Sequence, residues 1–499
     1  MEALNNLIMG LSSACSITNL LMALLGAFLG TLVGVLPGLG PTSTIAMLMP
    51  LTSVLSPSSA IIMMAGIFYG AQYGGSTTSI LVNIPGEVSS VPTLLDGYPL
   101  AVQGKAGVAL GIAAIGSFIA GTGGVVALSF FTPFLADQAL RFGPPEYFGL
   151  MLLALTVTVS VSGGSLIKGL LVGAFGYLIS LVGIGPNSGL PRFHYGFAVL
   201  YGGIDIVTIA IGVFALGEIF AGLEESRQAI TPKKIEKVFP SLQDLKQTLP
   251  SMIRGGTIGF LLGLLPGCNP AVTAFISYDV EKKISRHPER FGKGALEGVA
   301  APESANNATA SAAFIPLLAL GIPASPALAV LMGGFMMYGL QPGPLLIQNN
   351  PTLVWTIIGS MYVGNVMLLV LNLPLVGLWA KLTTVPYRIM APVIIMICMI
   401  GAYSLRNSMF DIGMTLIFGG VGYLMQKYKW PSAPLVLCSI LGPILEKSLV
   451  NSLAMSAGSP MIFFTRPICL ALILAACALL MISLRFIRKG KREDVKEEY

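Results

Sequence analysis

The sequence predicts an all-α, polytopic membrane protein with broken helices, arranged as two inverted repeats with roughly 11 to 13 transmembrane or re-entrant segments in total. Three observations predict this fold class. Hydrophobic residues make up 54% of the 499 residues and charged residues only 10%, whereas soluble domains carry about 25% charged residues. The apolar runs are long enough for spans of about 20 residues. One unusual segment occurs twice, once in each half.

The repeated segment ends an apolar run at a Leu-Pro-Gly break. Residues 26 to 44 read GAFLGTLVGVLPGLGPTST, and residues 255 to 273 read GGTIGFLLGLLPGCNPAVT. Nine of the nineteen aligned positions are identical. A hydrophobic segment interrupted at corresponding places of two halves points to the binding site of a secondary transporter. The two breaks are therefore predicted to contribute to one central site.

Basic residues predict how the chain is divided and oriented. Residues 223–250 form the one long hydrophilic interior stretch, and this stretch and the tail 485–499 are both rich in lysine and arginine. Both are predicted to be cytoplasmic, because these residues concentrate on that side of a membrane. They separate two membrane repeats, residues 1–222 and 251–484. Because the N-terminus bears Glu2 and no base, it is predicted to be periplasmic, which makes the first half an odd number of crossings and the repeats inverted.

Charges also flank the second copy of the repeated segment, since Arg254 precedes it and Lys282 follows it. Both of its ends are therefore predicted to be cytoplasmic. The two arms, 255–265 and 271–281, have eleven residues each and as helices reach about 16 Å, half of the hydrocarbon core. A re-entrant helical hairpin fits these lengths. The alternative is one continuous span, kinked at the proline.

Glycines spaced four residues apart lie on one face of each copy. Such faces allow a second helix to approach closely. We predict a packing role for them, without contact to a ligand. The residues are Gly26, Gly30, Gly34, Gly255, Gly259 and Gly263.

A cluster of uncharged polar residues follows each copy, in residues 69–90 and again in residues 301–326. Their hydroxyl and amide groups can donate to a carboxylate, and their oxygen atoms can coordinate Na⁺. A broken helix adds partial positive charge at its N-terminus and free carbonyl groups at its C-terminus. The alternative is that these side chains bond to their own helix or join helices together. The candidate substrate-binding residues are Gly38, Gly40, Pro41, Thr42, Ser43, Ser76, Thr77, Thr78, Asn83, Gly86, Gly267, Asn269, Thr273, Asn306 and Asn307.

Acidic residues near apolar runs are few, and an ionisable group inside a membrane is a functional candidate. They are Glu87, Asp96, Glu146, Asp205, Glu218, Glu303, Asp411 and Glu446. Glu303 stands out because it adjoins two asparagines, and a candidate Na⁺ site is predicted near Glu303, Asn307 and Thr309. The alternative is that Glu303 caps a helix beginning at Ser304 at the membrane surface.

Signatures of other functions are absent from the sequence. No HExxH, nucleotide-binding loop or CxxC pair occurs, and only two histidines are present, so neither an enzyme nor a resident metal or cofactor is predicted. The net charge of +6 is explained by basic residues in loops beside apolar runs, which fits a lipid bilayer better than nucleic acid.

Longer motifs resemble one known family. They are GVLPGLGPTSTIAMLMPLT (34 to 52), YGGSTTSILVNIPGEVSSVPTLLDGYPLA (73 to 101), GKAGVALGIAAIGSF (104 to 118) and GLLPGCNPAVTAFISYDVEKKISRHPERFGKGALEGVAAPESANNA (263 to 308). Through these motifs, essentially the whole chain resembles the large membrane subunit of the bacterial tripartite tricarboxylate transporters. Many relatives have glycines after the second Leu-Pro-Gly, where this chain has Cys268 and Asn269, so the chemistry of the second break is expected to differ.

The resemblance implies partners and a mode of transport. The expected partners are a small four-span membrane subunit and a periplasmic solute-binding protein that delivers an organic carboxylate. The expected location is the bacterial inner membrane, and the expected driving force is a gradient of Na⁺ or H⁺. The leading hypothesis is therefore a permease that imports a di- or tricarboxylate, and the resemblance leaves open which one. The alternative is a channel or scaffold subunit without coupling, in which the breaks are only structural kinks.

Overall fold

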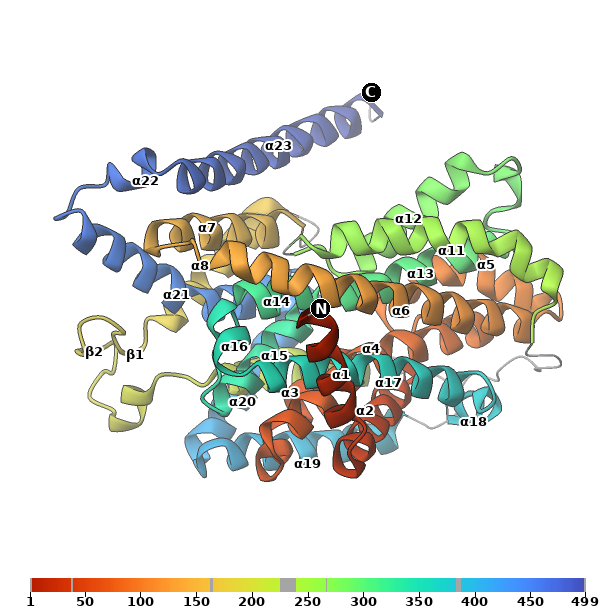
Figure 1. The fold of residues 1–499 in the computed structure, drawn as a ribbon, viewed down its shortest axis with the longest axis horizontal. Coiled ribbons are helices and arrows are strands. Elements are labelled where there is room, and N and C mark those ends of the chain that lie inside the picture. The colour runs from red at the N-terminus through yellow and green to blue at the C-terminus, as the bar shows by residue number, and fades with distance from the viewer. Residues whose placement is uncertain are drawn as a thin grey trace. The chain divides into compact units, whose positions relative to one another are not determined.

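The computed structural model describes residues 2–36, 39–161, 165–224, 239–265, 267–382 and 387–497. This part of the chain is almost wholly helical (Figure 1), and its only strands are the short antiparallel pair β1 (Gly183–Ile184) and β2 (Pro191–Arg192). The predicted all-α class is therefore confirmed.

The chain forms two compact units, and both halves of the sequence contribute to each of them. Unit 1 comprises Met1–Ala136 and Glu218–Asn407, and unit 2 comprises Asp137–Gly217 and Ser408–Tyr499. The predicted division at residues 223–250 stays a prediction, because residues 225–238 lie outside the described ranges.

Unit 1 contains both copies of the repeated segment. Its 3₁₀ turns are Met49–Val54, Val88–Ser90 and Pro288–Arg290. Helices α6 and α10 each include the boundary between the two units. The helices of unit 1 are α1 (Glu2–Ala14), α2 (Ile17–Val35), α3 (Pro41–Leu48), α4 (Pro57–Val82), α5 (Val91–Val102), α6 (Ala106–Ala139), α10 (Gly217–Glu224), α11 (Leu242–Gly263), α12 (Pro270–Ile284), α13 (Glu297–Ala312), α14 (Phe314–Leu320), α15 (Pro326–Met337), α16 (Pro344–Asn349), α17 (Pro351–Asn372), α18 (Val376–Leu382) and α19 (Tyr387–Arg406).

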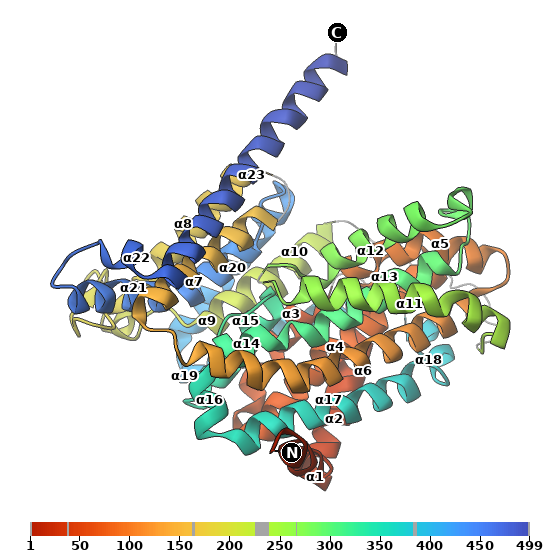
Figure 2. The ribbon, with the colours of Figure 1, turned by 45° about the horizontal axis from the view of Figure 1, so that its top comes forward.

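Unit 2 is built around α7, which packs against α8, α21 and α23 (Figure 2). An ion pair from Arg466 to the buried Glu146 joins the start of α23 to the start of α7, with an N–O distance of 3.5 Å. The 3₁₀ turn Ala198–Gly202 and the π-helical turn Ile211–Leu216 flank α9. The helices are α7 (Pro144–Val161), α8 (Leu166–Ser180), α9 (Ile206–Ala210), α20 (Met409–Lys427), α21 (Ala433–Met455), α22 (Ile462–Thr465) and α23 (Pro467–Glu497).

Seven helical segments of the described chain are long and apolar enough to cross a membrane: Ile17–Val35, Ala106–Ala139, Ile206–Glu224, Pro351–Asn372, Arg388–Arg406, Ala433–Met455 and Pro467–Leu484. They establish a multi-pass membrane protein, although they are fewer than the 11 to 13 segments predicted. The difference arises because other predicted segments are short helices or carry small and polar residues. Helices α4 and α13 are of this second kind, and both are buried along almost their whole length, so protein surrounds them in place of lipid.

The repeated segments pack in the same way in both halves. Helix α2 runs parallel to α4, and α11 runs parallel to α13. A methyl group on Gly26, Gly30 or Gly34 would collide with the backbone of Met63, Ile67 or Ala71. One on Gly255 or Gly259 would collide with the backbone of Ala301 or Ala305, and one on Gly263 with the side chain of Ala312. The predicted packing role of these glycines is confirmed, because a side chain would force the helices apart.

Helices α11 and α12 form a hairpin (Figure 1). Arg254 in the first arm lies 2.5 Å from Glu281 in the second, measured from Nη2 to Oε1, and Ser251 donates a hydrogen bond of 2.7 Å to the same carboxylate. In one continuous helix, Arg254 and Glu281 would be about 40 Å apart. The structure therefore excludes the continuous kinked span, while the depth of the hairpin in a membrane stays a prediction.

Helices α4 and α13 cross in opposite directions. The rings of Phe68 in α4 and of Phe314, the first residue of α14 just after α13, lie 6.0 Å apart. Ser76, further along α4, lines the same cavity as Glu303, which lies nearer the start of α13. The pair α2 and α4 therefore runs opposite to the pair α11 and α13. Repeats of inverted topology require this arrangement, and their orientation in a membrane stays a prediction.

Candidate functional site

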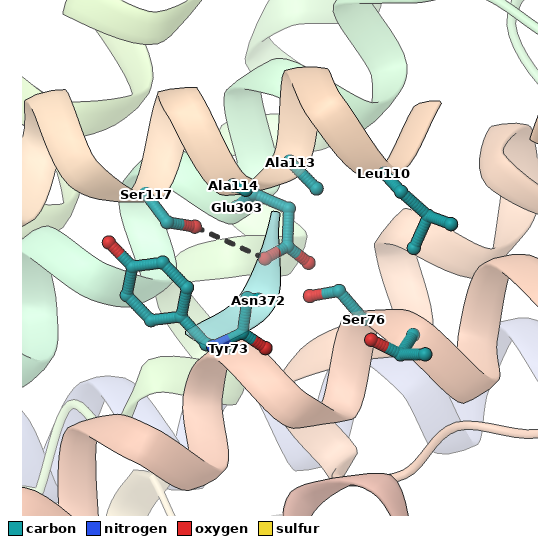
Figure 3. A pocket seen from close by; sticks show the side chains of 9 residues that line it. Tyr73, Ser76, Leu110, Ala113, Ala114, Ser117, Glu303 and Asn372 are labelled. Atoms are coloured by element: carbon teal, nitrogen blue, oxygen red, sulfur yellow. Dashed lines mark hydrogen bonds between the residues drawn. The ribbon is translucent and has the colours of Figure 1, made fainter. Parts of the chain in front are cut away.

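A small cavity lies at the crossing of α4 and α13, close to α6 and to the end of α17 (Figure 3). Its volume is about 10 Å³, which corresponds to a single water-sized sphere. Its lining combines apolar and polar side chains. The lining residues are Tyr73, Ser76, Thr77, Leu110, Ala113, Ala114, Ser117, Glu303 and Asn372.

Glu303 supplies the one carboxylate of this cavity. It is 1% exposed and lies inside α13, which begins at Glu297, so the interpretation of Glu303 as a cap of a helix starting at Ser304 is wrong. Its Oε1 accepts a hydrogen bond of 2.5 Å from Thr93, and its Oε2 accepts a long one of 3.5 Å from Ser117. No ion pair to Glu303 occurs in the described ranges. A buried carboxylate with only neutral donors is costly to keep ionised unless a cation joins it.

Two of the three residues predicted for the cation site lie together. The side-chain amide of Asn307 donates to the Ser117 hydroxyl at 2.7 Å, and Ser117 in turn contacts Glu303. Thr309 lies elsewhere on α13, where its hydroxyl is 2.7 Å from the Thr273 hydroxyl and 2.9 Å from the carbonyl oxygen of Gly259. The structure thus places Thr309 and Thr273 in a contact that joins the hairpin to α13.

Asn306 is the predicted substrate contact with the least satisfied surroundings. It is fully buried, and neither atom of its side-chain amide has a hydrogen-bond partner within the described chain. A buried amide without partners is uncommon in native proteins, because the hydrogen bonds that it loses to water are not replaced. The position of Asn306, one turn after Glu303, is consistent with contact to a ligand.

The first break presents the N-terminus of α3, which begins at Pro41, with Thr42 half-buried in its first turn. A carboxylate oxygen of Glu218 accepts hydrogen bonds there from the Gly40 amide at 3.4 Å and from the Ser43 hydroxyl at 2.6 Å. A carboxylate is stabilised at this position, because free N–H groups and the positive end of the helix dipole face it. Gly38 lies outside the described residues.

At the second break, the side chain of Asn269 caps the helix that follows. The Asn269 side-chain oxygen accepts a hydrogen bond of 3.1 Å from the Val272 amide and so caps α12. Gly267 adopts φ +86° and donates to the carbonyl oxygen of Ala324 at 3.0 Å. The two breaks therefore differ in structure, since Gly40 has no side chain with which to cap α3.

The remaining predicted residues of the first polar cluster have mixed surroundings. Ser76 and Thr77 line the cavity. The Thr78 hydroxyl donates to the carbonyl oxygen of Gly75, in its own helix, at 3.2 Å. Asn83 ends α4 with φ 60°, and Gly86 sits so close to the Gly34 carbonyl that no side chain would fit. Thr78, Asn83 and Gly86 thus have evident structural roles, and their contact with substrate stays a prediction.

The sequence was compared with known proteins. It matches the Tripartite tricarboxylate transporter TctA family over residues 20–437. The chain belongs to this family. One relative, an uncharacterized 52.8 kDa protein in the TAR-I ttuC' 3'region of Agrobacterium vitis, is 46% identical and aligns over 99% of both chains. A second protein of Agrobacterium vitis, from the TAR-II ttuC' 3'region, is 45% identical over 48% of this chain and 98% of its own length. No solved structure matches.

Several polar residues of this candidate site were not singled out from the sequence. Thr93, Ser117 and Asn372 contact Glu303 or line its cavity. Each is an isolated polar residue in an apolar segment, and such residues often only join helices. Glu218 carried a signal as one of the few acidic residues beside an apolar run, but nothing in the sequence placed it at the first break.

Proposed function

We propose that the protein is the large membrane subunit of a secondary transporter that imports an organic di- or tricarboxylate together with Na⁺ or H⁺. Its family supports a component of a tripartite tricarboxylate transporter. The observation that supports coupling to a cation gradient is the Glu303 carboxylate. It is buried at a crossing of two helices without a positive partner in the described chain. A small four-span subunit and a periplasmic binding protein complete the proposed system.

The proposed anion and cation sites have complementary charge. A substrate carboxylate would use the donors of Gly40 and Ser43 at the start of α3, where Glu218 now binds, and the amide of Asn306. The cation would neutralise Glu303. Because each ion lowers the cost of burying the other, the two bind with a favourable coupling free energy. Import of the carboxylate would then follow the gradient of the cation.

Accumulation in proteoliposomes tests this proposal. A panel of di- and tricarboxylates would first be screened for stabilisation of the binding protein, and the stabilising compound would be used radiolabelled. With all three components and an inward Na⁺ or H⁺ gradient, we expect its internal concentration to exceed the external one. Glu303→Gln should reduce accumulation at least tenfold, because the amide cannot carry the charge that the cation neutralises.

The exposed Glu289 provides the matched control, since it lies in a 3₁₀ turn at the surface. Glu289→Gln should accumulate substrate as the wild type does. Equilibration without accumulation, unaffected by ionophores, would instead support the alternative of an uncoupled channel or scaffold subunit. Full coupling in a folded Glu303→Gln variant would refute the role of Glu303.

A further inference from the structure

A groove separate from the candidate site runs between α6 and α11, which lie side by side in unit 1 (Figure 2). Its volume is about 320 Å³. The two helices approach each other at a glycine, because a Cβ atom added to Gly256 would lie 3.1 Å from the Cβ atom of Ala120. A Cβ atom added to Gly123 would meet no atom of the described chain within 4 Å. The absent side chains thus leave open space between the helices.

The lining of this groove suits hydrocarbon. No charged residue occurs among the described residues that line it, and Ile119, Ile253 and Leu261 expose their apolar side chains there. Thr257 is the only hydroxyl residue of this lining, and its hydroxyl donates to the carbonyl oxygen of Ile253, in its own helix, at 2.8 Å. The groove therefore has no free side-chain donor for a carboxylate. Its ligand must be apolar where it lies against the helices.

The groove lies at the middle of a membrane-spanning candidate. Helix α6 has 34 residues and is long and apolar enough to cross a membrane. Its length of about 51 Å exceeds the hydrocarbon core of about 30 Å, so its middle part lies within the core when it crosses. The lining residues 119–124 are in this middle part. Acyl chains are the solvent at that depth.

A lysine lies on the same face of α11, before the groove. Lys246 is exposed and precedes Ile253 by seven residues, a spacing that returns to the same face of a helix. Pro250 does not disturb this register, because Leu245 and Met252, also seven residues apart, pack in one core cluster. Lys246 and Ile253 each follow one of these two residues, so they share the adjoining exposed face.

The distance from this lysine to the groove matches the depth of one lipid leaflet. Eleven residues separate Lys246 from Thr257, which is about 16 Å in a helix, and half of the hydrocarbon core is about 15 Å. Arg254 is nearer, but its charge is paired with Glu281. The acidic residue of α11, Asp244, accepts hydrogen bonds from Ser241 at the start of the helix. Lys246 is thus the unpaired charge that a lipid phosphate would meet.

We propose that the groove binds one acyl chain of an anionic phospholipid, and that the phosphate group of this lipid contacts Lys246. The lipid belongs to the leaflet on the side of Lys246. Its chain fills the space left by Gly123 and Gly256 and covers the exposed apolar residues on both helices. Because α11 is the first arm of the hairpin, the bound lipid stabilises the contact of the hairpin with α6.

Photo-labelling of the purified full chain in phosphatidylcholine nanodiscs tests the proposal. The probe is phosphatidylglycerol with a diazirine on its acyl chain, and mass spectrometry locates the adducts. We expect adducts within residues 119–124 and 252–261, and competition by unlabelled phosphatidylglycerol but not by added phosphatidylcholine. Gly123→Leu should reduce labelling of these peptides at least fivefold, because its side chain occupies the groove. Lys246→Gln should reduce it at least threefold, and this variant changes only an exposed side chain.

Matched variants control for general effects on the protein. Gly377→Leu in α18 adds the same side chain where an added Cβ atom meets no described atom within 4 Å. Lys282→Gln removes another exposed lysine, in the second arm of the hairpin. Both variants should be labelled in the groove as the wild type is.

Three outcomes would overturn the proposal. The first is labelling of the groove that Gly123→Leu leaves unchanged. The second is equal competition by the two lipids, which would indicate only the general lipid surroundings of the protein. The third is a groove without adducts in the wild type whose Gly123→Cys variant forms a cross-link to a membrane partner, which would assign the groove to a helix of that partner.

Discussion

Two buried carboxylates of unit 1 have opposite surroundings, and their roles differ accordingly. Asp96 accepts a hydrogen bond of 2.9 Å from the Tyr278 hydroxyl and three more, of 2.8 to 2.9 Å, from the backbone amides of Gly292, Gly294 and Ala295. These donors stabilise its charge without an ion. Glu303 has two hydroxyl donors, one of them distant. Asp96 therefore holds α5 to the loop before α13, whereas Glu303 lacks such a set of donors.

Replacement of Asp96 tests this contrast. Asp96→Asn should destabilise the fold by roughly 2 to 4 kcal/mol, because the amide removes the charge and directs an NH₂ group at some of the backbone donors. We expect Tm to fall by several degrees in a thermal unfolding experiment in detergent. Asp279→Asn is the control, since its ion pair with Lys283 is exposed and is worth at most about 1 kcal/mol. Equal shifts of Tm for both variants would show that the hydrogen bonds of Asp96 do not hold α5 to the loop before α13.

At the residue scale, the sequence singled out two residues of the candidate site but not the residues that surround them. Glu303 and Asn307 could be found because a carboxylate beside asparagines is unusual in an apolar segment. Ser117 and Asn372 could not, since they are lone polar residues that become meaningful only when α6 and α17 meet α13. Thr309 was included as a hydroxyl residue of the same polar cluster, although its hydroxyl contacts the carbonyl oxygen of Gly259 and it does not line the cavity.

At the scale of elements, glycine spacing and charge were reliable indicators. Glycines four residues apart predicted close helix packing, and the charges of Arg254 and Lys282 predicted that the chain turns back between them. The partners of the glycine faces, α4 and α13, could not be identified from the sequence. Each is separated in the sequence from its glycine-bearing helix by another helix. Its packing against the glycine face depends on its burial over its whole length.

The glycine face of α11 gives a prediction at this scale. A methyl group on Gly259 would collide with the backbone of Ala305, and backbone atoms cannot move aside as a flexible side chain can. Gly259→Ala should therefore destabilise the protein by roughly 1 to 3 kcal/mol, seen as a lower Tm and a smaller monodisperse fraction in detergent. Gly123→Ala in α6 meets no atom within 4 Å and should be neutral or slightly stabilising, because alanine favours helix. A neutral Gly259→Ala would contradict the close packing.

At the scale of the whole molecule, composition predicted the membrane and the helical class, and the repeat predicted two similarly packed helix pairs. The division into units was not predictable, because each unit combines stretches from both halves of the chain. Such a division follows from long-range contacts that leave no local pattern. The opposite course of α4 and α13 agrees with inverted repeats, which makes the membrane topology the property most in need of a test.

The segment Ile206–Glu224 is apolar and long enough to cross a membrane, so the residues on its two sides should face opposite compartments. Ser188 and Gln243 are exposed positions before and after it. In a background without cysteines, Gln243→Cys should react with an impermeant maleimide only from the cytoplasmic side, because the adjoining stretch is rich in lysine. Ser188→Cys should react only from the periplasmic side, and labelling after solubilisation controls for access. Reaction of both from one side would remove this crossing and, with it, the odd number of crossings that inverted repeats require.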